Sequence, residues 1–421
     1  MSKELSNRAQ WALLIVSVLS LLAGAILISD SQKGGGRVVK WTLGPGGDYG
    51  YGPAVFASNG TMYVWEGSYR DDSTHLYCVS PDGEVNWTKD IYTIDQAIVG
   101  SDGTLYLGGW INATDAKRSV CALQPNGEYK WIREFRNGSF YSLSQGVDSN
   151  LYSISSTLSS EEAGGSRIAS FTTSGDMRWY LSPGENLSFT SLFTAPNGTL
   201  MSCVNDHRLV GIGDNGSILW SRPAAIPVEP YIVKDDRMFG TLNYHSQQDK
   251  GYGDSSGLYC FDLNGTVLWK HPAGLVNQSF AKYVAEDSYG TLYYRGHGGS
   301  VMPSFACAVN QDGELLWQYV KGSIYSAVLY ADELIVSTSE GIVALDISGN
   351  ESWAMDGVSG SLSVSPSGLL IVTSWDGISA VVKRAASDIA LVGAAGVAFI
   401  VFGIAVVGYV VTKTRRTKRV R

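Results

Sequence analysis

A ten-residue unit recurs seven times without a gap and constrains this chain more than any other feature. Each copy opens with a small residue, has glycine at its sixth position and closes with tryptophan. The copies are CVSPDGEVNW (78–87), ALQPNGEYKW (122–131), SFTTSGDMRW (170–179), GIGDNGSILW (211–220), CFDLNGTVLW (260–269), AVNQDGELLW (308–317) and ALDISGNESW (344–353). Self-similarity of this kind is the signature of a repeat architecture, in which neighbouring units bury one another's apolar faces.

Each copy predicts a β-hairpin. Asp-Gly, Asn-Gly or Ser-Gly at positions five and six favours a two-residue type I′ turn, and the flanking residues alternate as strands do. The small residue at the first position would let an indole from a neighbouring sheet lie against the backbone. We therefore expect the tryptophans to pack between sheets.

A second motif, a turn followed by a strand, precedes each hairpin and also begins an eighth, incomplete unit. Its copies are NGTMYV (59–64), DGTLYL (102–107), DSNLYS (148–153), NGTLMS (197–202), DDRMFG (235–240), YGTLYY (289–294), DELIVS (332–337) and SGLLIV (367–372). Together the motifs make four strands in about 45 residues, which is the length of a propeller blade.

The eighth unit lacks its tryptophan strand. It continues as ISAVVKR (378–384), with Ala380 in the small position, and the missing strand is found at the other end as RVVKWTL (37–43). Pairing the first strand with the last three removes exposed sheet edges. The sequence therefore predicts an all-β, eight-bladed β-propeller over 37–384, closed by its N-terminal strand. The docking tryptophans would be Trp41, Trp87, Trp131, Trp179, Trp220, Trp269, Trp317 and Trp353.

These residues resemble the tryptophan-docking repeat of the PQQ-type propellers, over about 37–384. That family includes quinoprotein alcohol dehydrogenases and a bacterial outer-membrane assembly lipoprotein, and the chain resembles the non-enzymatic lipoprotein more. It departs from the longest family consensus by one turn residue, and an Asp at the third position remains only as Asp262 and Asp346. The resemblance implies the fold, whereas chemistry has to be argued from the site.

The residues that quinoprotein chemistry needs are not found. Quinoproteins of the family stack their cofactor above two adjacent cysteines, and no two of the five cysteines here are adjacent. The sequence has no C-x-x-C or histidine-rich metal spacing, no G-x-S-x-G elbow and no phosphate-binding loop. We expect no catalytic residues, no cofactor and no metal site; a propeller oxidoreductase with an unrecognised site is the alternative.

Two apolar segments flank the propeller. Residues 389–411 form an uncharged apolar segment that is long enough to span a bilayer. Six positive charges in the last nine residues mark the cytoplasmic side. We predict a transmembrane helix over 388–411 and a cytoplasmic tail over 412–421; a buried helix is the alternative. Residues 11–29 are a signal anchor or a cleaved signal peptide, between a cytoplasmic stretch, 1–10, and a linker, 30–36.

Charge argues against nucleic acid as a partner. The chain has a net charge of −8, and removing the six positive charges of the tail and the one net positive charge of the first ten residues leaves −15 for the rest. A body with this balance repels phosphate backbones. In the predicted topology the propeller lies on the extracytoplasmic side of the cell membrane. Its membrane partner is lipid, which contacts the one or two predicted transmembrane helices.

The long connections between strands indicate where a partner would bind. The two motif turns share one face of the ring, and the other connections, several of them long, share the opposite face, which points away from the membrane. Rigid scaffolds carry function on such loops, and aromatic and Arg side chains favour binding. Candidate contacts are Tyr69, Arg70, Asp71, Asp72, Trp110, Tyr244, His245, Tyr252, Arg295 and His297.

The function that these features favour is a membrane-anchored, cell-surface module that binds or scaffolds a protein or glycan without catalysis. An electron-transfer or assembly subunit beside another membrane protein is a further option. An externalised body would also be glycosylated at Asn-x-Ser/Thr sites that have no role as turn residues. The candidates are Asn112, Asn137, Asn186 and Asn277.

Overall fold

The computed structural model describes most of the region between Arg37 and Lys383. The described ranges are 37–44, 50–67, 74–111, 118–135, 140–157, 165–184, 187–195, 198–204, 208–223, 228–234, 237–242, 257–262, 266–272, 280–297 and 304–383. Within these ranges no helix has the length and apolar character needed to cross a membrane. The predicted segments 1–10, 11–29, 30–36, 388–411 and 412–421 lie outside the described residues.

The described chain is all-β and forms eight antiparallel four-stranded sheets. The first four, from the innermost strand outwards, are β2 (Val55–Phe56), β3 (Met62–Gly67), β4 (Thr74–Val79), β5 (Val85–Ile91); β6 (Thr93–Val99), β7 (Leu105–Trp110), β8 (Arg118–Leu123), β9 (Tyr129–Phe135); β10 (Phe140–Gln145), β11 (Leu151–Thr157), β12 (Gly165–Phe171), β13 (Met177–Leu181); and β14 (Phe193–Thr194), β15 (Leu200–Val204), β16 (Arg208–Ile212), β17 (Ile218–Pro223). The next three are β18 (Val228–Lys234), β19 (Arg237–Leu242), β20 (Gly257–Asp262), β21 (Val267–Pro272); β22 (Phe280–Glu286), β23 (Leu292–His297), β24 (Ser304–Val309), β25 (Leu315–Val320); and β26 (Ile324–Tyr330), β27 (Glu333–Thr338), β28 (Gly341–Leu345), β29 (Glu351–Asp356). We number these sheets as blades one to seven.

The eighth blade is assembled from both ends of the propeller. Its strands are β30 (Ser361–Val364), β31 (Leu370–Ser374), β32 (Gly377–Lys383) and, outermost, β1 (Arg37–Leu43). Trp41 and Leu43 pack against the buried cluster that contains Ile378 and Ala380 of β32. The prediction that the N-terminal strand completes the last blade and closes an eight-bladed propeller is confirmed.

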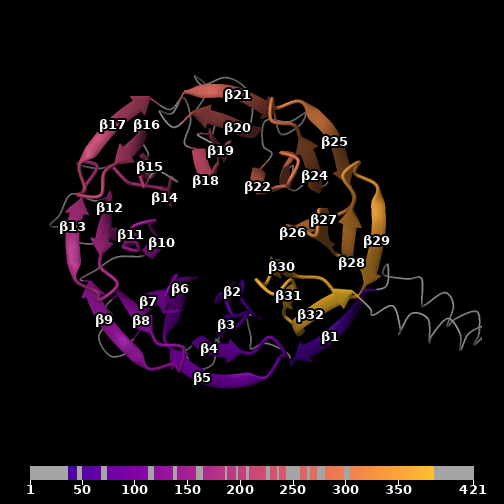
Figure 1. Cartoon of the computed structure of the whole chain (residues 1–421), viewed down its shortest axis with the longest axis horizontal. Helices are drawn as coiled ribbons and strands as arrows, with labels where there is room; N and C mark the ends of the chain where they lie inside the picture. Colours follow the sequence, from indigo (N-terminus) through magenta and orange to yellow (C-terminus); the bar gives the residue numbers. More distant parts are fainter. Residues whose placement is uncertain are drawn as a thin grey trace, which may run out of the picture. The chain divides into compact units, whose positions relative to one another are not determined.

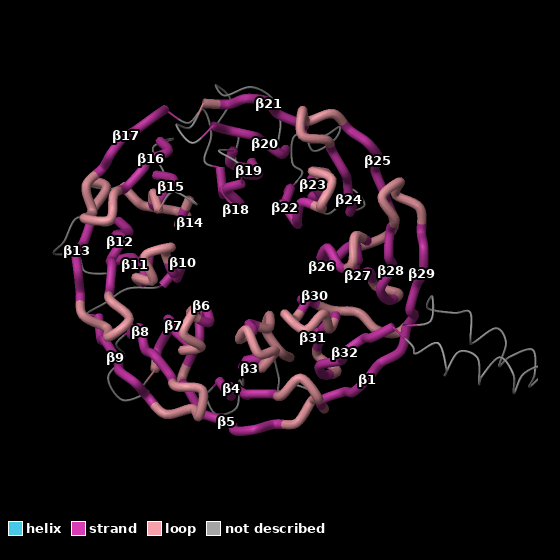
Figure 2. Tube along the Cα trace, in the orientation of Figure 1, coloured by secondary structure: helices cyan, strands magenta, loops and turns pink. Residues whose placement is uncertain are grey.

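Two compact units divide the chain. The larger comprises Trp41–Glu351 and Gly357–Ala380, contains strands from all eight blades and forms a ring with the innermost strands around its axis (Figures 1 and 2). In the described part of the smaller unit, the Arg37 guanidinium lies 5.0 Å from the centre of the Trp353 ring. Such a cation–π contact holds the start of β1 beside β29.

The turn between the third and fourth strands of a blade differs from the predicted two-residue type I′ turn. In blade one the Ser80 amide donates to the Glu84 carbonyl and the Gly83 amide donates to the Ser80 carbonyl, at 2.8 Å and 3.0 Å. Gly83 has φ +88°, whereas Asp82 has no positive φ. These features define a three-residue loop with a bulge at the glycine, because a type I′ turn needs two positive φ angles.

The tryptophans dock onto this turn in the following blade. The Trp87 indole nitrogen donates to the Pro125 carbonyl at 2.8 Å, and its ring covers Gly127. The same pair of contacts recurs with the carbonyls of Pro81, Thr173, Asp214, Gln311 and Ile347, which receive Trp41, Trp131, Trp179, Trp269 and Trp317. Among the described residues, six of the eight predicted docking tryptophans therefore dock onto the turn of the following blade.

The expected role of the small first-position residue was wrong in one respect. It faces the tryptophan of its own blade rather than a neighbour's: Cys78 pairs with Trp87, and Gly211 pairs with Trp220. A Cβ at Gly211 would lie 2.2 Å from the Trp220 ring. The small side chain lets the indole lie across its own sheet. The other side of the indole contacts the turn glycine of the following blade.

The hydrophobic core is distributed between adjacent blades. One cluster joins Tyr63, Leu76 and Cys78 of blade one to Leu105 and Leu107 of blade two, all of them buried. Similar clusters join later pairs of blades. Because every blade buries both faces of its middle strands, no blade is a stable unit alone.

Candidate functional site

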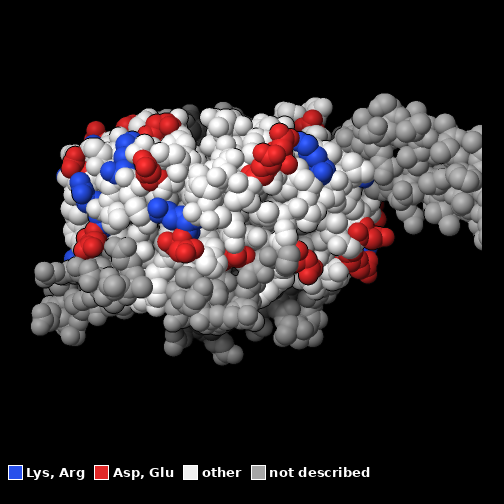
Figure 3. Space-filling model, turned by 90° about the horizontal axis from the view of Figure 1, so that it is seen from below, with Lys and Arg blue, Asp and Glu red and all other residues white. Residues whose placement is uncertain are grey.

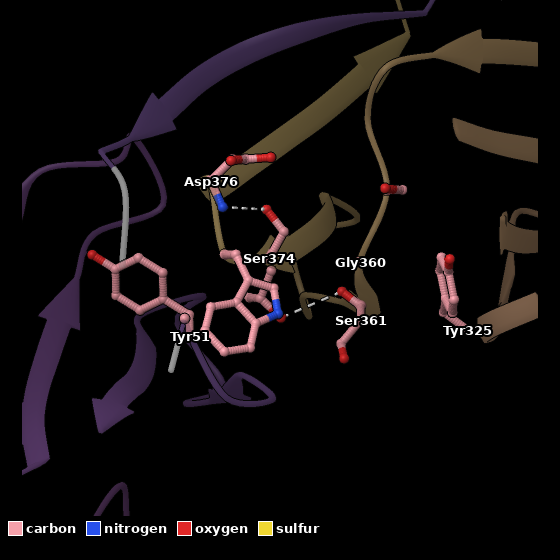
Figure 4. A pocket seen from close by; sticks show the side chains of 10 residues that line it. Tyr51, Tyr325, Gly360, Ser361, Ser374 and Asp376 are labelled. Atoms are coloured by element: carbon pink, nitrogen blue, oxygen red, sulfur yellow. Dashed lines mark hydrogen bonds between the residues drawn. The ribbon is translucent and has the colours of Figure 1, made fainter. Parts of the chain in front are cut away.

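A pocket of the described chain lies where blades seven, eight and one meet. It has a volume of about 420 Å³, within the range of small-ligand sites. Its lining residues are Gly50, Tyr51, Tyr325, Ser359, Gly360, Ser361, Thr373, Ser374, Trp375 and Asp376. Figure 4 shows Tyr51 and Tyr325 on opposite sides, with Ser361 and Ser374 between them.

Chain order places this pocket on the face opposite the short motif turns. Residues 374–376 connect the second and third strands of blade eight, and residues 359–361 lead from blade seven into blade eight. Tyr51 lies on the connection from β1 into blade one. These are the two kinds of connection that the sequence assigns to the partner face. The closure of the ring thus brings residues from the two ends of the propeller into one site.

Trp375 stands at the tip of a tight turn and is 64% exposed. In this turn Ser374 Oγ accepts from the Asp376 amide at 3.2 Å and donates to the Gly377 carbonyl at 3.1 Å. The corresponding turn of blade seven, Thr338 to Gly341, has the same two bonds, with Thr338 Oγ1 accepting from the Glu340 amide and donating to the Gly341 carbonyl. Its tip carries Ser339 in place of the tryptophan. The turn therefore forms without an indole.

Two glycines let neighbouring segments approach this turn closely. Gly50 has φ +68°, and a Cβ there would lie 3.0 Å from the Trp375 Cα. Gly360 has φ +156°, and a Cβ there would lie 2.2 Å from the Thr373 carbonyl oxygen. The Gly360 amide also donates to the buried Ser337 Oγ at 2.9 Å. At these two glycines the pocket wall is backbone packed on backbone, so this part of it is preformed.

A partly buried hydrogen-bond network fixes the ring of Tyr51. Its hydroxyl hydrogen-bonds with that of Tyr77, which donates to the carboxylate of the buried Glu66. The Tyr51 and Tyr77 rings meet edge to face, 5.7 Å apart. Burial and the Glu66 charge raise the pKa of Tyr51 to about 12. Tyr51 therefore stays neutral, and its hydroxyl is held by the network.

The pocket has acidic character. Among its described lining residues Asp376 is the one ionisable carboxyl, exposed at the rim, and none is Lys or Arg. Figure 3 shows acidic groups over the visible side of the molecule, some with basic side chains beside them, and no broad basic surface. The site is thus suited to neutral or cationic groups and poorly suited to phosphates.

The structure describes few of the predicted partner contacts. Trp110 ends β7, where its ring stacks on Tyr92 with 5.2 Å between centres, and the partly buried Arg295 lies in β23 of another blade. Neither lines the pocket. For His297 only the strand position is described, and Tyr69, Arg70, Asp71, Asp72, Tyr244, His245 and Tyr252 lie outside the described residues. The same holds for Asn112, Asn137, Asn186 and Asn277.

The cysteines are packing residues. All five, Cys78, Cys121, Cys203, Cys260 and Cys307, are free and buried. Burial raises the pKa of the Cys121 and Cys307 thiols to about 12 and that of Cys260 to about 11. Among the described residues no group of His, Cys, Asp and Glu has the arrangement needed to hold a metal ion.

Tyr51, Tyr325, Trp375 and Asp376 were missed by reasoning from the sequence. One signal could have indicated Trp375: it is one of four tryptophans outside the docking positions, with Trp11, Trp65 and Trp110. Comparing SWDG (374–377) with TSEG (338–341) at the same place in the preceding blade would have isolated it. Tyr51 and Tyr325 have no such signal, because the connection and the inner-strand end that carry them do not repeat.

A family model agrees with the repeat. The model described as outer membrane protein assembly factor BamB matches residues 164–384, which is more than half of the chain. No curated protein sequence matches.

Solved structures share the fold at low sequence identity. The crystal structure of BamB from Moraxella catarrhalis is 15% identical, with a TM-score of 0.53, and the match covers 82% of this chain and 97% of that one. The Dos1 propeller is 11% identical, with a TM-score of 0.54, and the match covers 82% of this chain and 94% of that one. These likenesses support the propeller fold.

Proposed function

The chain belongs to the PQQ-type propeller family described as outer membrane protein assembly factor BamB, and we propose that it is a binding or scaffolding module that holds a partner protein at its long-loop face. In this proposal the ring is a rigid support, and its long-loop face recognises the partner without catalysing a reaction. A glycan partner is an outcome that the test below would reveal.

The observation that carries the proposal is the exposed Trp375 beside a preformed pocket. A tryptophan at the tip of a turn that forms equally well with serine contributes little to folding, yet it leaves a large apolar surface in water. Tryptophan and tyrosine are the residues most enriched at binding hot spots. Tyr325, 52% exposed, adds a second such surface to the same pocket.

The proposal includes a membrane tether. The chain enters the ring at Trp41, whose indole bonds to the Pro81 carbonyl on the short-turn face. An apolar segment beginning at Ile389, soon after the last strand, would hold this face near the bilayer. The long-loop face would then point outward into the extracytoplasmic space, with the basic tail in the cytoplasm.

Site-directed photo-crosslinking in intact cells tests the proposal. The full chain carries p-benzoylphenylalanine in place of Trp375 on the long-loop face or, as the matched control, in place of the exposed turn residue Asn126 on the short-turn face. We expect a discrete protein adduct from position 375 and none from position 126. Adducts only from position 126 would contradict the proposal, and so would a saccharide adduct at position 375.

A second measurement addresses the oxidoreductase alternative. The purified full chain, supplied with PQQ and calcium, is tested for oxidation of alcohols and sugars. The binding-module proposal predicts no turnover above that of the Trp375→Ser variant. Turnover that requires both additions would favour the enzyme.

A further inference from the structure

We propose that the pocket between blades seven, eight and one captures a lysine side chain from a basic segment of the partner protein. The inference rests on the proposed function and adds the chemistry of recognition. It is carried by three observations: aromatic rings in the wall, a carboxylate with no Lys or Arg among the described lining residues, and a turn that forms without its tryptophan.

The aromatic wall supplies attraction for a cation and its alkyl stem. Tyr51, Tyr325 and Trp375 line the pocket, and Trp375 and Tyr325 are more than half exposed. A cation near the face of an aromatic ring is attracted by the ring quadrupole, most strongly for tryptophan. The four methylene groups of lysine bury their stem along such surfaces while the ammonium stays near water.

Charge selects the sign of the ligand. The Asp376 carboxylate stands next to Trp375 at the rim, and Glu66 lies behind Tyr51, linked to it through the Tyr77 hydroxyl. None of the described lining residues is basic, so an anion would find no counter-charge among them. An ammonium group near Asp376 would gain a charge-assisted hydrogen bond.

Backbone and hydroxyl groups complete the site. Ser359 and Ser361 line the pocket together with residues 373–376, and Thr373 Oγ1 donates to the Ser361 carbonyl at 3.4 Å. Lysine has three donors and no acceptor, so it would be bound by oxygen atoms. The serine hydroxyls and the Asp376 carboxylate of this pocket provide such acceptors.

The two related turns provide variants that separate recognition from folding. Trp375→Ser gives blade eight the tip residue that blade seven already has, in a turn with the same hydrogen bonds. Asp376→Asn removes the charge at the rim. Glu340→Gln removes an exposed carboxylate at the matching position of blade seven and serves as the control for net charge.

The test is calorimetric titration of the full chain in detergent with a lysine-containing peptide, Ac-Gly-Lys-Gly-amide. The same peptide with an acetylated lysine keeps the stem and removes the charge, and choline chloride tests a lipid-type ammonium. We expect Trp375→Ser and Asp376→Asn each to weaken binding at least fivefold, Glu340→Gln to change it less than twofold, and the acetylated peptide not to bind. Thermal melting of each variant checks that the fold is intact.

Three results would overturn the inference. The first is that the lysine peptide shows no saturable binding. The second is that Asp376→Asn and Glu340→Gln weaken peptide binding equally. The third is that choline binds, and Trp375→Ser abolishes its binding, while the lysine peptide does not bind. If photo-crosslinks still form from position 375 in any of these cases, the proposed function stands and only the lysine assignment fails. If the peptide binds as expected but position 375 gives no protein adduct, the proposed function fails separately.

Discussion

The indole of Trp41 covers Gly83, so that a Cβ on Gly83 would lie 2.6 Å from the Trp41 ring. Trp41 belongs to the strand that opens the described chain, and Gly83 belongs to the first complete blade. This contact is the first of the six described contacts in which a tryptophan docks onto the turn of the following blade. It also joins blade eight to blade one, so it bears directly on ring closure.

Replacing Gly83 by alanine should destabilise the ring more than the same change at a free turn. Gly83→Ala forces a side chain into positive φ, costing about 1–2 kcal/mol, and pushes against the Trp41 ring, costing about 1–3 kcal/mol more. Gly103→Ala is the matched control, because Gly103 has φ +78° with nothing within 4 Å of the added Cβ. Denaturant unfolding should place the Gly83→Ala midpoint lowest. Equal midpoints would show that the indole does not press on the turn.

Replacing Ser149 by glycine should stabilise the protein. Ser149 has φ +63° at a turn position where glycine stands in most other blades, as Gly103 does in blade two. Removing the side chain relieves left-handed strain but adds freedom to the unfolded chain, leaving a net gain of about 0.5–1 kcal/mol. Ser101→Gly, at an exposed turn residue without a positive φ, should be neutral or destabilising. A drop in the unfolding midpoint of Ser149→Gly would contradict this account.

The sequence repeat predicts the number of blades and the closure of the ring, because each depends on a local pattern that recurs. The glycine at position six and the tryptophan at position ten place a turn and an outer strand in every copy, and the copy without a tryptophan identifies the seam at Trp41. The type of this turn could not be predicted from the repeat. Asn-Gly and Asp-Gly suit both a type I′ turn and a three-residue loop with a bulge, and the choice depends on strand register.

The pocket could not be predicted for a different physical reason. Its wall joins a connection after β1, an inner strand of blade seven and a turn of blade eight, so it exists only once the ring closes. Gly50 and Gly360 shape it through backbone approach, which leaves no mark in the repeat. The predicted contacts were instead drawn from long loops, most of which lie outside the described residues.

Stability should fall as the pH drops from about 7 to 5.5, partly through His271. Burial lowers the pKa of His271 below its ordinary value, against the opposing effect of a 2.9 Å contact with the Gly313 carbonyl. The unfolded chain therefore takes up this proton at a higher pH than the folded chain, which favours unfolding as the pH falls through that window. The melting temperature of His271→Gln should depend less on pH between 7 and 5.5. An unchanged pH dependence in the variant would exclude His271 as a contributor.

The cysteines should resist modification in the native state. Burial keeps the pKa of Cys121, Cys260 and Cys307 at about 11–12, so little thiolate is present at pH 8, and all five thiols are buried. With Ellman's reagent the native chain should release almost no chromophore in minutes, and the denatured chain should release five equivalents. Rapid labelling of the native chain would show that the blades open readily.

Ring closure is the central structural claim, because it completes the eighth blade and brings Tyr51 beside Trp375. Hydrogen–deuterium exchange of the full chain, read by mass spectrometry on peptides covering 37–44 and 377–383, tests it directly. We expect the β1 amides that bond to β32 to exchange as slowly as those of β32, and Trp41→Ala to speed exchange in both peptides. Complete exchange of 37–44 within seconds in the unmodified protein, while 377–383 stays protected, would contradict closure by the N-terminal strand.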